Sequence, residues 1–155
     1  MKKFINKINI LLDKQDYNSL DEVKENLDSK ASGFYWIYTS KTIQDFKKCS
    51  KPTDDKHIDL KKLSKIHDNL TCIIHQNGSD LWCIYNGKGK ELKKRIVQEF
   101  NQGTGTGTLA LLRDFKVEDF KIKYIVCEKD SYMKYQKDLE RVWRLNYKFP
   151  IFCRT

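Results

Sequence analysis

Apolar residues recur at every third or fourth position along much of the chain, which is the spacing of one buried helix face. Leu92, Ile96 and Phe100, each four residues from the next, are a clear example. One helix start is marked by Ser19 and Glu22, which have the spacing of a capping box. The predicted helices cover residues 2–14, 19–31, 43–48, 59–66, 91–101, 109–115 and 131–147.

Four shorter segments are rich in aromatic and β-branched residues or alternate between apolar and polar positions, which favours strands. They cover residues 34–38, 71–75, 81–85 and 120–127. The second and third form a predicted hairpin around Asn77-Gly78, and the third is expected to end at Asn86-Gly87. With the helices, these strands predict an α/β fold of the α+β kind, with a small antiparallel or mixed sheet of three to four strands.

A chain of 155 residues is long enough for one hydrophobic core, so we predict a single domain over residues 1–155. The polar stretch at 40–58, which contains Pro52, is expected to be an insertion. The two N-terminal helices either cover the core or form the surface of a homodimer. The apolar residues 151–153 are expected to pack back on the body of the domain.

The chain is strongly basic. Thirty Lys and Arg residues against 21 Asp and Glu give a formal net charge of +9. This excess favours polyanionic partners, nucleic acid before an anionic membrane surface. The alternative is a lysine-rich proteome in which every protein has a similar excess.

Several sequence features bear on the compartment. No apolar run is long enough to span a bilayer, and the N-terminal segment lacks the pattern of a signal peptide. The five cysteines show no CxxC spacing, which predicts free thiols in the reducing cytoplasm. No histidine falls at zinc-ligand spacing with a cysteine pair, so a structural zinc site is not expected.

The segment 81–101 combines groups that suit a phosphodiester. Tyr85 lies near a predicted strand end, and Arg95 lies beside the apolar stripe of the following helix. The surrounding lysines are Lys88, Lys90, Lys93 and Lys94. Because arginine and lysine neutralise phosphate charge, this cluster favours a phosphate-binding site. The alternatives are that Arg95 pairs with Glu91 and Glu99 along the helix and that the lysines form a solvated face.

Two short motifs precede this arginine. The first reads Gly33-Phe34-Tyr35, the second reads Tyr85-Asn86-Gly87, and Glu140 lies on the last predicted helix. Together with Arg95, in the order strand, strand, helix, strand, helix, they resemble the GIY-YIG nuclease superfamily. The resemblance divides the domain into a core at 33–147, with an insertion at 39–70, a helical extension at 1–32 and a tail at 148–155.

The resemblance implies an endonuclease that hydrolyses phosphodiester bonds with a single Mg²⁺, or with Mn²⁺ in its place. In that scheme Tyr35 activates the attacking water with help from Tyr85. Arg95 stabilises the phosphate, and the catalytic Glu140 holds the metal ion. Substrate contacts are expected from Gly87 and the four lysines, and DNA is favoured over RNA as the substrate.

The chain departs from the family at Glu99, one turn after the arginine, where histidine or tyrosine is common. Glu99 either fixes Arg95 in place or marks a loss of activity. A catalytically weak nucleic-acid-binding protein on the same scaffold is therefore the main alternative to a nuclease. A third hypothesis is a basic interaction protein in which the motifs occur by chance.

Overall fold

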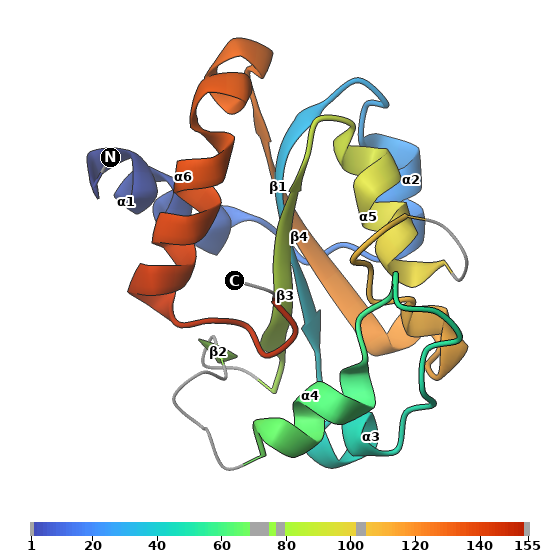
Figure 1. The fold of residues 1–155 in the computed structure, drawn as a ribbon. Helices are drawn as coiled ribbons and strands as arrows, with labels where there is room; N and C mark the ends of the chain where they lie inside the picture. The colour runs from blue at the N-terminus through green and yellow to red at the C-terminus, as the bar shows by residue number, and fades with distance from the viewer. Residues whose placement is uncertain (1, 69–74, 77–79, 102–104, 154–155) are drawn as a thin grey trace.

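One antiparallel sheet organises the computed structural model, which describes residues 2–68, 75–76, 80–101 and 105–153. Its three long strands are β1 (Ser32–Thr39), β3 (Trp82–Gly89) and β4 (Phe120–Cys127), and β2 (His75–Gln76) adds a two-residue edge. The order across the sheet is β2-β3-β1-β4, so β1 lies between β3 and β4 (Figure 1). All of these pairings are antiparallel, which confirms the predicted α+β class.

Six α-helices pack around the sheet within the described part of the chain. They are α1 (Lys2–Lys14), α2 (Leu20–Asn26), α3 (Ile43–Lys47), α4 (Leu60–Ile66), α5 (Leu92–Phe100) and α6 (Lys129–Tyr147). In Figure 1, α2 and α5 cover one face of the sheet, α1 and α6 cover the other, and α3 and α4 lie at one end. Ser19 and Glu22 form the predicted capping box at the start of α2.

The central strand β1 is buried along its whole length. Successive side chains of a strand point to opposite faces, and those of β1 enter two separate cores. Tyr35 and Ile37 pack with the apolar residues of α2 and α5, whereas Phe34 and Trp36 pack with those of α1 and α6. The first core therefore includes the tyrosine of the Gly33-Phe34-Tyr35 motif.

The predicted end of the third strand at Asn86-Gly87 is wrong, because β3 continues to Gly89. Gly87 pairs with Tyr35 of β1, and Gly89 pairs with Gly33. These glycines do not form a turn. Their lack of a side chain lets Tyr35 and Arg95 lie close to the strand.

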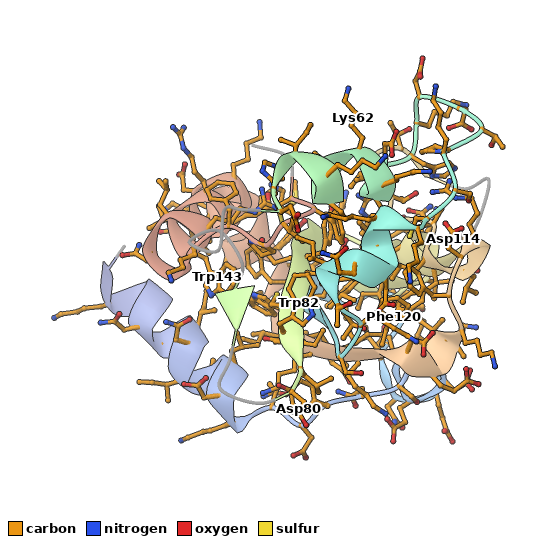
Figure 2. The ribbon with its side chains drawn as sticks, turned by 90° about the horizontal axis from the view of Figure 1, so that it is seen from below. Lys62, Asp80, Trp82, Asp114, Phe120 and Trp143 are labelled. Carbon is orange, nitrogen blue, oxygen red and sulfur yellow. The ribbon has the colours of Figure 1, made fainter. Side chains whose placement is uncertain are left out.

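The insertion and the tail close one end of the sheet. In Figure 2, which looks onto this end, Trp82 of β3 and Phe120 of β4 lie beside α3. Phe46 of α3 is fully buried there, with its ring 6.0 Å from that of Trp82 and 4.9 Å from that of Phe152. The Phe152 amide donates a hydrogen bond to the Ile84 carbonyl (3.1 Å), so the tail packs on the body as predicted.

Three other predicted elements differ in extent. The helix expected at 19–31 ends at Asn26, because Leu27 has an extended backbone (ψ 127°) that stops it. The helix expected at 109–115 is only a 3₁₀ turn at Leu111–Arg113, because Ala110 has a left-handed backbone (φ 48°) that interrupts a helix. Of the strand expected at 71–75, only His75 belongs to β2, and residues 71–74 lie outside the described residues.

Cys49, Cys83, Cys127 and Cys153 are free thiols, as predicted, and Cys72 lies outside the described residues. Among the described helices, none is both long and apolar enough to cross a membrane.

Candidate functional site

The two sequence motifs meet across the β1–β3 pair. Tyr35 lies directly opposite Gly87, and a Cβ atom at Gly87 would lie only 2.4 Å from the Tyr35 hydroxyl oxygen. The Tyr35 ring therefore occupies the space that any larger residue at position 87 would need. The Tyr85 ring lies beside it, with the two ring centres 6.0 Å apart.

Glu99 of α5 connects these tyrosines to the helix. Its carboxylate is fully buried and accepts a hydrogen bond from the Tyr35 hydroxyl at 2.5 Å. The second oxygen accepts the backbone N–H of Leu109 at 2.9 Å. Arg95, one turn earlier, places its Nη2 atom 3.4 Å from the first oxygen. Glu99 thus contacts Arg95, as the first of its two predicted roles requires, and also holds Tyr35 and the segment around Leu109.

Burial dominates the acid–base properties of this cluster. It raises the pKa of Glu99 to about 7, although Arg95, the Tyr35 hydroxyl and the Leu109 amide each act to lower it. Burial, together with the Glu99 carboxylate, also raises the pKa of Tyr35 well above 10 and raises that of Tyr85. Both phenols therefore keep their protons at neutral pH, and Tyr35 acts as a donor to Glu99.

Arg95 is the member of this cluster that reaches the surface. Its side chain is 25% exposed, and its Nη1 donates to the Thr106 carbonyl at 3.3 Å. Gly89 lies beneath it, because a Cβ atom there would be 2.9 Å from the Arg95 Cβ. The guanidinium is therefore held by Glu99, by the Tyr85 hydroxyl and by Thr106, and a quarter of the side chain stays exposed.

A groove of about 380 Å³ lies in front of Arg95, between α5 and the start of α6. The groove is lined by Lys88, Gly89, Lys90, Glu91, Lys94, Arg95, Gln98 and Tyr132. Four of these side chains are cationic and one is anionic. A larger cavity of about 860 Å³ lies at the insertion, but three aspartates and two lysines line it and no motif residue does. We therefore place the candidate site at the basic groove.

Two of the residues predicted to contact substrate lie apart from the groove wall. The Lys93 ammonium donates to the Lys24 carbonyl at 2.7 Å, in the last turn of α2. Gly87 is buried beneath Tyr35. Lys88, Lys90 and Lys94 do line the groove, so three of the four predicted lysines are brought together with Arg95.

Glu140 lies on α6, across the sheet from the tyrosines. Its Oε2 accepts the Lys88 ammonium at 2.5 Å, and its Oε1 accepts Nη2 of Arg144 at 3.1 Å. Arg144 is buried and also donates to the side-chain and backbone oxygens of Asn86, at 2.7 and 2.8 Å. Glu140 is therefore linked to the groove through Lys88 of β3, which pairs with Glu140 and also lines the groove.

The residues around Glu140 do not fit the divalent metal that the resemblance implies. Mg²⁺ binds carboxylate oxygens at about 2.0–2.1 Å, whereas both Glu140 oxygens already accept hydrogen bonds from cations. Within the described residues, no group of three or more His, Cys, Asp or Glu side chains gathers to hold a metal ion. As arranged, Glu140 serves an ion-pair network.

Several residues of the site carry no motif signal in the sequence. Arg144 could be found from its spacing, four residues after Glu140, which is the spacing of a helical ion pair. Tyr132, Thr106 and Leu109 join the site only through the tertiary fold.

Comparisons with protein-family models, curated proteins and solved structures found no match for this chain.

Proposed function

We propose that this protein binds nucleic acid through its phosphate backbone, at the groove in front of Arg95. The observation that carries this proposal is the charge of the groove, where three lysines and a held arginine face one glutamate. Arg95 is fixed by Glu99 and Thr106, so little side-chain freedom is lost when it binds a phosphate.

Two further features support an anionic ligand at this place. The groove lies at the start of α5, where the helix dipole presents partial positive charge. Among the described residues, the Glu91 side chain makes no capping hydrogen bond to the first backbone N–H groups of α5. The protein as a whole carries a net charge of +9, which favours encounter with a polyanion.

The test is fluorescence anisotropy with labelled duplex DNA, single-stranded DNA and RNA at several salt concentrations. The affinity should fall steeply as salt rises, because bound phosphates release counterions. Lys94→Glu should weaken binding about tenfold at moderate salt. Lys62→Glu is the matched control, because it makes the same charge change on α4, at the other end of the sheet from the start of α5 (Figure 1). An equal loss in both variants would show that the groove is not the binding site.

A second candidate is the endonuclease, favoured by the gathering of Tyr35, Tyr85 and Arg95 with Glu99 on one face of the sheet. Phosphodiester hydrolysis needs an activated water and stabilisation of the charge that develops on phosphorus. Arg95 can supply the second, and Glu99 is a proton acceptor in direct contact with Tyr35. Binding ranks first because the Tyr35 side chain is fully buried, and it must become accessible before it can touch a water at phosphorus.

The two candidates are separated by incubation with supercoiled plasmid, with Mg²⁺ or Mn²⁺ and with EDTA. Nicking that requires the metal and disappears in both Arg95→Ala and Glu140→Ala would establish the endonuclease. An intact plasmid that the protein still retards in a gel at low salt would leave binding as the function.

A further inference from the structure

We infer that Lys88 takes the place of a divalent cation in this site: its ammonium, held by Glu140, contacts the phosphate, and binding needs no metal ion. This inference rests on the proposed function, because it concerns how the same groove holds a phosphate.

The position of Lys88 is the first observation. It lines the groove with Arg95 on one side, and its Nζ lies 2.5 Å from Glu140 Oε2 on the other. An ammonium has three N–H donors. One of them serves Glu140, which leaves two for a phosphate in the groove. A carboxylate that holds a cation against a phosphate is the arrangement of a metal site, with the ammonium as the cation.

The support behind Glu140 is the second observation. Its other oxygen is held by Arg144, and Arg144 is buried and fixed by two hydrogen bonds to Asn86. Asn86 is only two residues before Lys88 on β3, so the strand that carries Lys88 also anchors its partner. The carboxylate therefore has little freedom to turn toward another ligand.

The charge balance is the third observation. One glutamate is paired with one lysine and one arginine, so the cluster already carries a net positive charge without a metal. A divalent ion at Glu140 would lie beside two cations in a partly buried place, where like charges repel strongly. Lys88 and a metal ion are thus alternatives at the same carboxylate.

The inference predicts rescue by a metal when Lys88 is removed. Lys88→Met keeps the aliphatic chain and leaves the Oε2 oxygen of Glu140 without the Lys88 ammonium. We expect it to weaken duplex binding in EDTA about threefold and to reduce the salt slope by about 1. Added Mn²⁺, at matched ionic strength, should restore this loss. Lys90→Met, which removes an exposed lysine of the same groove, should also weaken binding but should not be rescued.

The direction in which Glu140→Gln changes the duplex affinity is a second test. Glutamine can still accept a hydrogen bond from Lys88 while removing a negative charge, so duplex affinity should stay equal or rise. A metal site would lose affinity in the same variant. Thermal unfolding of each variant checks that the fold is kept.

Electron paramagnetic resonance of Mn²⁺ with the protein alone tests, without nucleic acid, whether Lys88 keeps a metal ion away from Glu140. Bound Mn²⁺ should appear in Lys88→Met and be absent in wild type and in Lys88→Met/Glu140→Gln. Glu140-dependent Mn²⁺ binding by wild type, or no gain in Lys88→Met, would overturn the inference. If no variant bound a duplex, the proposed function would fail while the Mn²⁺ result still decided the role of Lys88.

Discussion

Alanine at Gly87 perturbs the contact on which the site is built. The added Cβ would lie 2.4 Å from the Tyr35 hydroxyl oxygen and 2.5 Å from the ring carbon that carries it. Tyr35 cannot move aside freely, because its side chain is fully buried and its hydroxyl is bound to Glu99. The substitution must therefore displace the ring, the strand or both.

Two contributions set the expected loss of stability. Overpacking of a buried contact costs about 1–3 kcal/mol. Displacement of the Tyr35 hydroxyl removes the short hydrogen bond to the buried Glu99 oxygen, which costs about another 1–3 kcal/mol. Alanine also stabilises the folded state by roughly 0.4–1 kcal/mol, because it lowers the conformational entropy of the unfolded chain. We therefore expect Gly87→Ala to lower the free energy of unfolding by about 2–5 kcal/mol.

Urea denaturation, followed by tryptophan fluorescence, measures this loss. Gly107→Ala is the control, because nothing lies within 4 Å of a Cβ there and only its positive φ (69°) opposes alanine. That strain costs about 1–2 kcal/mol. The cost of Gly87→Ala should also be smaller in a Tyr35→Phe background, which lacks the nearest atom. A loss below about 0.5 kcal/mol, or an equal loss in both backgrounds, would refute the packing of Tyr35 on Gly87.

Three further predictions concern the same face of the sheet. Burial raises the pKa of Glu99 from 4.5 to about 7, so the folded state binds its proton more tightly and the free energy of unfolding should fall as pH rises from 4.5 to 7. At 1.36 kcal/mol per pKa unit the fall is at most about 3 kcal/mol, and urea denaturation of Glu99→Gln should show this contribution removed. Tyr35→Phe should cost about 1–3 kcal/mol in the same assay, because a buried carboxylate oxygen loses its donor; an unchanged midpoint would contradict that bond. Lys93→Ala should leave duplex affinity nearly unchanged in the anisotropy assay while Lys94→Ala weakens it, because Lys93 donates to the end of α2; equal losses would place Lys93 in the groove.

The local elements followed from the sequence because their signals are local. The capping box at Ser19, the aromatic run of β1 and the alternation of β4 fix structure through neighbouring residues alone. The sequence predicts too early an end for β3, because Asn86-Gly87 has the composition of a turn. What keeps the strand extended is tertiary: Gly87 lies against Tyr35, and Arg144 satisfies both oxygens of Asn86.

The same division holds for the candidate site. The pairing of Arg95 with Glu99 could be predicted from their helical spacing, and the structure has it at 3.4 Å. The hydrogen bond from Tyr35 to Glu99 could not, because it joins a strand to a helix that follows a long insertion. The pairing of Lys88 with Glu140 joins β3 to α6 and was equally out of reach of local patterns.

The alternation of β3 explains why Glu140 and the tyrosines are on different sides of the sheet. Gly87 and Gly89 face Tyr35 and Arg95, so Asn86 and Lys88 must face α6, where they meet Arg144 and Glu140. A shift of the strand by one residue would exchange these faces. It would also place a side chain against the Tyr35 hydroxyl, which the pairing of Tyr35 with Gly87 avoids. Lys88 thus connects the two sides, since it is held by Glu140 and still lines the groove of Arg95.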